Sequence, residues 1–241
     1  EYLKQVLPQV KGVVLSDYGS GTITDKLLGQ IFAYCQEHNI PTIVDSRYDI
    51  LRFKTVDYIK QNDAELSAAI GRDLATEEEL VQGGCELLVK MSAKGALITR
   101  GEDGMSLFQI ISPQEAADYL KSQEVSGSGE AGQFREGLTV KLVVKRQTGR
   151  LSVVQELISY QDRDILVSHI PVTDKSEVYD VSGAGDTCVA TVILGLAAGL
   201  EPLLACQLSN EASGIAVRKM GTSVVYAREL EARFRQLGYE A

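Results

Sequence analysis

Segments typical of β-strands alternate with segments typical of α-helices along most of this chain. An apolar strand is predicted at 12–16, and Thr24 and Asp25 then cap a helix whose apolar side chains recur at helical spacing as far as Cys35. Further strands are predicted at 42–45, 56–60, 96–99 and 105–108, and further helices from 62 and over 76–91. This alternation predicts an α/β fold with a mostly parallel central sheet, in which helices connect neighbouring strands.

Polar residues follow several of these predicted strands. Asp17, Asp45, Asn62 and Arg100 each stand at a strand end. Because ligands in open α/β sheets bind beyond the carboxyl ends of the strands, we expect these four side chains to share one rim of the sheet. Three helices are predicted to complete the fold, over 187–200, 202–219 and 227–237.

The alternation is interrupted between residues 109 and 167. This stretch contains a helical segment at 113–123, a loop rich in Gly and Ser at 126–132, and two alternating segments at 138–145 and 151–160 that predict a β-hairpin. We interpret 109–167 as an insertion or small subdomain, and 1–108 together with 168–241 as the core domain.

The composition limits the classes of protein and partner that fit this chain. Its 241 residues are 44% hydrophobic, enough for a packed core, and 33 acidic against 24 basic residues give a net charge of −9. Such an acidic chain is a poor non-specific binder of nucleic acid. Since no apolar run is long enough to span a bilayer and no signal peptide is evident, no membrane partner is expected. Four widely spaced cysteines predict reduced, buried thiols in a cytoplasmic protein rather than a zinc site.

Two glycine-rich segments are candidates for phosphate binding. Residues 127–132 match G-x-G-x-x-G, but no apolar strand precedes them and no convincing helix follows, so a flexible connector is favoured over an NAD-binding fingerprint. Asp180–Thr187, in contrast, joins an extended stretch to a helix beginning near Gly185. Its glycines let backbone N–H groups approach an anion, and Asp186 in the first turn could accept a proton from an attacking hydroxyl. A glycine-rich turn with Asp186 as an ordinary first-turn acid explains the spacing equally well.

Several motifs in a fixed order resemble those of one enzyme family. Asp180–Thr187 reads D-V-S-G-A-G-D-T and is similar to the D-[TV]-[ST]-G-A-G-D signature of the ribokinase (PfkB) family of carbohydrate kinases. Other segments resemble the S-D-Y-x-K-G, V-D-P-K, P-N-x-x-E, T-R-G-x-x-G-M-S-L and A-N-A-A-G motifs of its heptose-phosphate kinase branch, at 15–21, 44–47, 61–65, 99–107 and 210–214. The chain is therefore identified as a member of this family over about residues 10–108 and 168–237, which implies a ribokinase-like three-layer α/β/α fold.

The resemblance implies transfer of the γ-phosphoryl group of ATP to a hydroxyl of a sugar or a sugar phosphate similar to a heptose 7-phosphate. In the family pattern Asp186 is the catalytic base, and the N–H groups of Gly183, Ala184 and Gly185 form an anion hole. Asn62 and Glu65 match the N-x-x-E pair that acts through water on Mg²⁺. The remaining implied contacts are Thr99, Arg100, Gly101 and Gly104 at the nucleotide phosphates, Asn210 at the adenine, and Asp17 and Arg47 at the sugar.

Several of these residues also have ordinary structural explanations. Asn62 and Glu65 would equally form a helix cap, which is compatible with both roles. Arg100 would equally be a solvated surface residue, and Asp17 would equally stabilise its own turn.

The chain also departs from the family pattern. Ser20, Ser46, Arg47 and Gln61 stand where the branch has lysine, proline, lysine and proline, which removes one candidate phosphate contact and changes the geometry of another. Nothing in residues 1–11 resembles the family's N-terminal half, so its lid region is expected to be absent. A second function therefore stays open, a non-catalytic module of kinase ancestry that binds a nucleotide or a partner. The resemblance further implies a homodimer and an adenylyltransferase, fused or separate, as partners.

Overall fold

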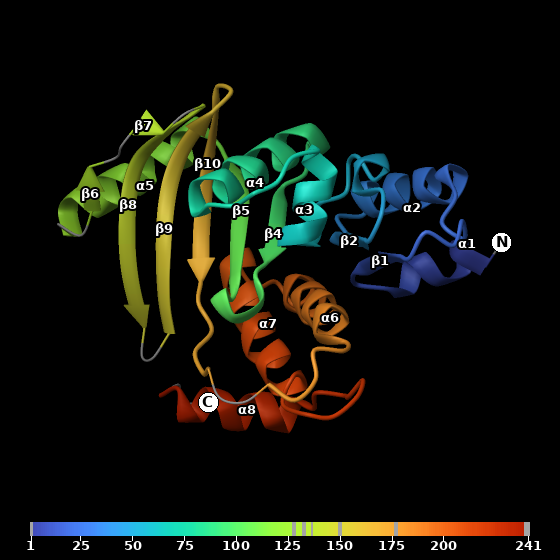
Figure 1. Cartoon of the computed structure of the whole chain (residues 1–241). Coiled ribbons are helices and arrows are strands. Elements are labelled where there is room, and N and C mark those ends of the chain that lie inside the picture. The colour runs from blue at the N-terminus through green and yellow to red at the C-terminus, as the bar shows by residue number, and fades with distance from the viewer. Residues whose placement is uncertain are drawn as a thin grey trace.

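A computed structural model of the chain describes residues 2–126, 129–131, 134–135, 137–148, 151–175 and 178–238. Its ten described strands form one sheet (Figure 1). One end of that sheet consists of β1 (Val13–Asp17), β2 (Thr42–Ser46), β3 (Tyr58–Asn62) and β4 (Gly95–Thr99), in this order. It continues through β5 (Met105–Ile111), β10 (Arg163–Ile170), β9 (Leu151–Tyr160), β8 (Leu138–Thr148) and β6 (Gly129–Ala131), with β7 (Phe134–Arg135) also paired to β8.

The α/β class is confirmed, but the sheet is mixed rather than mostly parallel. β1, β2, β3 and β4 pair in parallel, whereas each described pairing from β4–β5 onward is antiparallel. The connections explain the difference. Parallel neighbours need a long crossover, whereas a short turn such as 101–104 joins antiparallel neighbours.

Helices cover both faces of the sheet and give the expected three layers (Figure 1). On one face pack α2 (Asp25–Glu37), α3 (Asp63–Ile70) and α4 (Glu77–Met91), whose buried side chains join a single apolar core with the strands. On the other face pack α6 (Ala184–Ala197) and α7 (Pro202–Ala216). The other described helices are α1 (Tyr2–Val6), α5 (Pro113–Ser126) and α8 (Ala227–Gln236).

Capping side chains fix where the helices of the first face begin. The Thr24 hydroxyl accepts a hydrogen bond from the N–H of Leu27 at the start of α2 (3.3 Å). α4 begins with a capping box between Thr76 and Glu79, as the sequence predicts. α3 starts directly after β3 with a second capping box, and this one holds polar side chains at the rim of the sheet.

The segment 109–167 continues the central sheet. Its predicted hairpin is present as β8 and β9, and β9 pairs with β10, a strand that the sequence pattern did not predict. α5 lies against this part of the sheet, where the Tyr119 hydroxyl donates to the Gln155 side chain (3.3 Å). Whether the segment is an insertion stays a prediction. Of the G-x-G-x-x-G match, Gly127, Ser128 and Gly132 lie outside the described residues.

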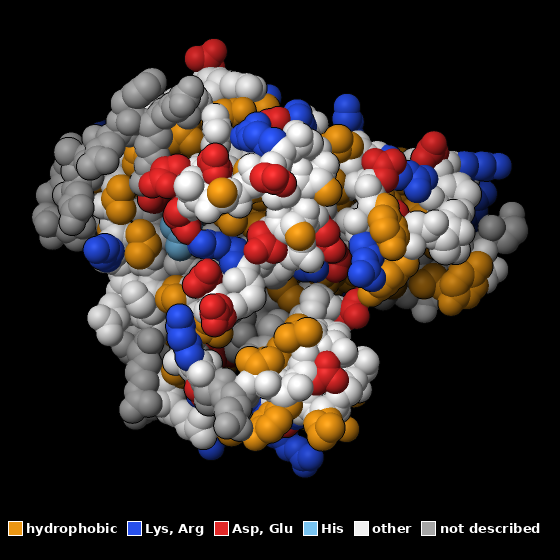
Figure 2. Space-filling model, viewed as in Figure 1, with side chains coloured by type: hydrophobic (Ala, Val, Ile, Leu, Met, Phe, Trp, Pro, Cys, Tyr) orange, Lys and Arg blue, Asp and Glu red, His pale blue; other side chains and the backbone are white. Residues whose placement is uncertain are grey.

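The surface carries both signs of charge. On the face shown in Figure 2, acidic and basic side chains of the described residues are interspersed and form no continuous basic patch. No helix within the described ranges is long and apolar enough to cross a membrane. Attraction for a phosphate group on this face therefore has to come from a few local groups.

Candidate active site

The glycine-rich segment at 180–183, called here the glycine turn, leads into α6. Two cavities flank the N-terminus of this helix. The first, called here the β1–β3 cavity, has a volume of about 500 Å³ and is lined by the carboxyl ends of β1, β2 and β3 and by the turn itself. The second, the β4–α7 cavity, has a volume of about 450 Å³ and is lined by the turn between β4 and β5, by residues 172–181 in part, and by α7. Val181 and Gly185 line both cavities, so α6 begins between them.

The glycine turn is shaped by one left-handed residue and one carboxylate. Gly183 precedes the first turn of α6 with a φ of 77°, a conformation that favours glycine. Asp180 accepts hydrogen bonds from the backbone N–H groups of Ser182 (2.8 Å) and Gly221 (3.0 Å). These bonds lower the pKa of the Asp180 carboxyl group and tie the turn to the segment after α7.

The first turn of α6 presents backbone N–H groups between the cavities. Thr187 donates the first hydrogen bond within the helix, to the carbonyl of Gly183 (2.9 Å), and the N–H of Ala184 donates to a carbonyl three residues earlier (3.2 Å). The N–H groups of Gly185 and Asp186 precede the helical ladder and have no partner inside the helix. Such donors, together with the positive end of the helix dipole, favour an anion.

A buried lysine lies next to this turn. Lys60 of β3 forms an ion pair with Asp45 of β2, with 3.1 Å between Nζ and Oδ2 and side-chain exposures of only 7% and 17%. A Cβ on Gly185 would lie 3.0 Å from Nζ of Lys60, so glycine permits this close approach. Burial favours the neutral amine, but the Asp45 carboxylate outweighs it and raises the pKa of Lys60. Burial raises the pKa of Asp45, against the opposing effect of Lys60.

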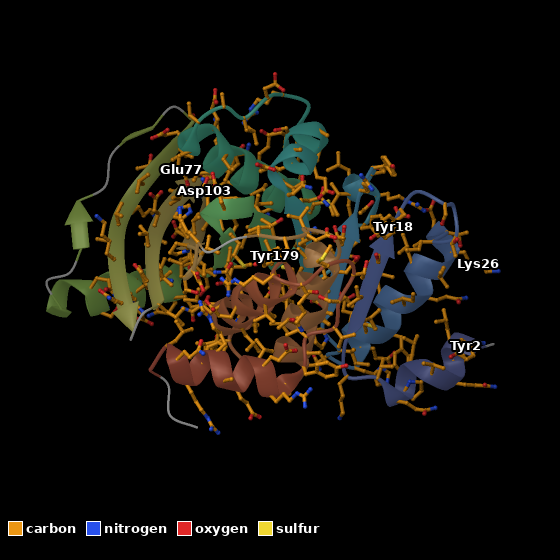
Figure 3. The ribbon with its side chains drawn as sticks, turned by 60° about the horizontal axis from the view of Figure 1, so that its bottom comes forward. Tyr2, Tyr18, Lys26, Glu77, Asp103 and Tyr179 are labelled. Atoms are coloured by element: carbon orange, nitrogen blue, oxygen red, sulfur yellow. The ribbon has the colours of Figure 1, made fainter. Side chains whose placement is uncertain are left out.

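Asp186 is exposed to the β1–β3 cavity and receives a hydrogen bond from across it. The hydroxyl of Tyr18, at the end of β1 (Figure 3), donates to Oδ1 of Asp186 (3.2 Å). The nearby carboxylate raises the pKa of Tyr18, because ionisation would place two negative charges side by side. The fold thus joins two residues that are 168 positions apart in the sequence.

Asn62 and Glu65 line the same cavity and form the capping box of α3. Oδ1 of Asn62 accepts from the N–H of Glu65 (2.7 Å), and Oε2 of Glu65 accepts from the N–H of Asn62 (2.8 Å). The described residues contain no group of three or more His, Cys, Asp or Glu side chains arranged to hold a metal ion. The carboxylate and amide oxygens of this pair fit Mg²⁺ that keeps its waters and binds mainly to phosphate.

The two residues expected at the sugar differ in exposure. Asp17 is only 5% exposed, and its carboxylate oxygens accept from the N–H of Gly19 (3.1 Å) and the hydroxyl of Ser46 (3.0 Å). Asp17 therefore stabilises its own turn, the ordinary alternative given above. Arg47 is exposed at the cavity and has no ion-pair partner among the residues that the structure describes.

Four of the residues expected at the nucleotide line the β4–α7 cavity. They are Thr99, Gly101, Gly104 and Asn210. Asn210 is buried, and its side-chain amide donates to the carbonyl of Pro171 (2.9 Å), which fixes its orientation.

Arg100 lies apart from these four residues. It is not among the residues that line either cavity, and its guanidinium pairs with both carboxylate oxygens of Glu77 in α4. Figure 3 shows Glu77 on the opposite side of the view from Tyr18. A role for Arg100 at the phosphates stays a prediction.

Sequence reasoning placed Asp45 at the rim but missed Lys60 and Tyr18 as members of the site. Lys60 had a usable signal, because it is a charged residue in the predicted strand 56–60, two residues before Asn62. A charged residue in such a strand needs a partner of opposite charge. Tyr18 had no comparable signal, since its partner Asp186 is remote in the sequence.

Comparison with known proteins shows the family to which the chain belongs. The sequence model of the pfkB family carbohydrate kinases matches residues 1–126 and 157–227. The chain belongs to the pfkB carbohydrate kinase family. The match includes residues 1–9, 109–126 and 157–167, which the motifs alone did not cover. The unmatched residues 127–156 fall within the segment interpreted as an insertion.

Curated relatives match nearly the whole of this chain. The bifunctional protein HldE of Rhodospirillum rubrum is 29% identical over 235 residues, which are 97% of this chain and 36% of that protein. HldE of Hyphomonas neptunium is 31% identical over 237 residues, 98% of this chain and 38% of that protein. The chain thus spans little more than a third of the length of these relatives.

The solved structures confirm the ribokinase-like fold. Ribokinase from Arabidopsis thaliana, complexed with ribose and ATP, matches with a TM-score of 0.61 at 16% identity, over 98% of this chain and 58% of that one. Phosphofructokinase-2 from Escherichia coli, in complex with potassium, matches with a TM-score of 0.58 at 18% identity, over 98% and 60%. The absence of a lid region stays a prediction.

Proposed function

We propose that this chain transfers the γ-phosphoryl group of ATP to a hydroxyl group of a sugar or sugar phosphate. One observation carries the proposal, namely the position of Asp186 and the glycine turn between two cavities. Residues with nucleotide motifs line the β4–α7 cavity, and residues with acceptor motifs line the β1–β3 cavity. Phosphoryl transfer needs a donor and an acceptor on opposite sides of the transferred group, and this arrangement supports that geometry.

Asp186 is the catalytic base in this proposal. Its carboxylate lies in the β1–β3 cavity, within reach of an acceptor hydroxyl bound there, and can accept the proton of that hydroxyl. The N–H groups of Gly183, Ala184 and Gly185 form the anion hole for the charge that develops on the transferred group. The N–H of Gly185, which lacks a helical partner, contributes most, and Lys60 adds a fixed positive charge beside it.

Asn62 and Glu65 would hold Mg²⁺ through water at the edge of the β1–β3 cavity. When bound, the ion neutralises charge on the nucleotide phosphates. The capping box supports this role, because it fixes both side chains in place before any ligand binds.

On the nucleotide side, Thr99, Gly101 and Gly104 border the phosphates and Asn210 borders the adenine. Their common place along the β4–α7 cavity supports these roles. Arg100 would join them only on leaving Glu77, so its contact with the phosphates stays a prediction.

The acceptor is a sugar phosphate of the heptose 7-phosphate type in this proposal. Arg47 supports it, because this exposed guanidinium at the cavity suits a phosphate group. Since Asp17 is engaged within its turn, it shapes the acceptor site rather than binding the sugar directly.

The test is a product assay on the purified chain. ATP with Mg²⁺ is incubated with ribose, fructose 6-phosphate and heptose 7-phosphate, and phosphorylated sugar is detected by mass spectrometry. The proposal predicts a Mg²⁺-dependent product with at least one phosphorylated acceptor. ATP binding in calorimetry without product from any acceptor would instead support a non-catalytic nucleotide-binding module.

The name of the HldE relatives suggests a further partner. They are called bifunctional, and we propose that this chain works beside an adenylyltransferase, fused or separate. A homodimer and a cytoplasmic location belong to the same proposal. Size-exclusion chromatography with light scattering tests the dimer.

A further inference from the structure

One hydrogen bond in the β1–β3 cavity joins the residue that follows β1 to the first turn of α6. The Tyr18 hydroxyl donates to Oδ1 of Asp186 across a distance of 3.2 Å. Among the described residues, no other side chain forms a hydrogen bond to the Asp186 carboxylate. Oδ2 is thus left for a ligand in the cavity.

The backbone that carries Tyr18 is held on both sides. Asp17 is buried, and its carboxylate accepts from the N–H of Gly19 and from the hydroxyl of Ser46. The carbonyl of Asp17 also accepts from the N–H of Arg47 (3.0 Å). The first bond closes the turn and the other two tie the end of β1 to the end of β2. Tyr18 therefore projects from a fixed turn, although the residue itself is 58% exposed.

We propose that Tyr18 is a positioning residue for Asp186, whose hydroxyl holds one carboxylate oxygen and so turns the other toward the acceptor hydroxyl. This inference rests on the proposed function of Asp186 as the base. A carboxylate at the start of a helix can rotate about two side-chain bonds, and only some of its rotamers point into the cavity. A hydrogen bond to the charged group restricts it to one of them, which matters because transfer depends on alignment.

The arrangement also gives Asp17 an indirect role in the reaction. Its carboxylate is engaged within the turn, as described above, and reaches the reaction only by fixing the residue that follows it. The buried Asp17 therefore fixes the turn, the turn fixes Tyr18, and Tyr18 orients Asp186.

A spectroscopic titration tests the contact without relying on turnover. Absorbance of tyrosinate is followed with rising pH in the parent, in Tyr18→Phe and in Asp186→Asn. The difference between the parent and Tyr18→Phe isolates the titration of Tyr18, which we expect above the usual range because of the adjacent carboxylate. Asp186→Asn removes that charge, so the titration of Tyr18 should move to lower pH. An unchanged titration in Asp186→Asn would overturn the proposal.

Kinetics test the positioning role itself. With saturating ATP and acceptor, Tyr18→Phe should lower kcat by about tenfold to a hundredfold, as expected for the loss of a hydrogen bond to a charged group, with the KM for ATP nearly unchanged. Tyr48→Phe is the matched control, because Tyr48 is an exposed tyrosine whose ring packs on Gly19 nearby. Equal kcat values in the two variants would refute the positioning role. If the parent shows no turnover with any acceptor, the proposed function fails, and the titration still decides whether the contact exists.

Discussion

Replacing Lys60 by methionine should destabilise the fold, because it leaves the carboxylate of Asp45 buried without its partner. The two side chains are 7% and 17% exposed and 3.1 Å apart. Breaking such a buried pair costs about 3–5 kcal/mol, and we expect about 3 kcal/mol because Asp45 retains some contact with solvent. For a chain of this size that loss corresponds to a fall in Tm of roughly 6–12 °C.

The assay is urea unfolding followed by circular dichroism, on Lys60→Met, Asp45→Asn and the double variant. The double variant should recover most of the loss, because no uncompensated charge remains in the interior. A Lys60→Met variant within about 0.5 kcal/mol of the parent would refute the buried-pair reasoning.

Lys60→Met should also change how the stability of the fold depends on pH. Burial already raises the pKa of Asp45, and Lys60→Met removes the lysine that opposes this effect. Protonation of Asp45 removes the uncompensated charge, so stability lost at high pH should return as the pH falls through this raised pKa. The deficit of Lys60→Met relative to the parent should therefore be smaller at about pH 5 than at about pH 8. An equal deficit at both pH values would contradict this account.

Two further predictions concern the turn between β4 and β5 and the capping box of α3. Gly104→Ala should destabilise the fold by several kcal/mol, the order of magnitude expected for a backbone clash. Its φ is 87°, and a Cβ would lie 2.1 Å from the carbonyl oxygen of Ile170. Gly101→Ala, at φ 55° with open space around the Cβ, should cost only about 1 kcal/mol in the same urea assay. Glu65→Gln keeps a side chain that can complete the capping box, so it should melt like the parent while requiring much more Mg²⁺ for turnover. A Mg²⁺ titration identical to the parent's would remove Glu65 from the metal site.

The helices of the first face were predictable because their signals are local. Thr76 and Glu79 stand three residues apart before an apolar run, and the capping box formed where the spacing predicted. β10 was missed because helices and strands do not alternate regularly in the stretch around it. A local signal was present, since Ile165 and Val167 alternate with partly polar neighbours as expected of a strand. Its pairing with β5 across a long stretch of sequence is a tertiary contact that no local window records.

The site shows the same division between local and long-range information. The spacing of Asn62 and Glu65 predicted the helix cap, and the end of the preceding strand predicted the position of Asn62 at the rim. The ion pair of Arg100 with Glu77 and the contact of Tyr18 with Asp186 could not be predicted, because each joins elements that come together only when the sheet forms.

The central claim is that Asp186 accepts the proton of the acceptor hydroxyl during phosphoryl transfer. It is tested most directly by comparing the rate of phosphorylated-sugar formation in the parent and in Asp186→Asn, at saturating ATP and Mg²⁺. The account predicts a fall in kcat of about a hundredfold or more, with ATP binding retained in calorimetry. An Asp186→Asn variant that forms product at the rate of the parent would contradict it.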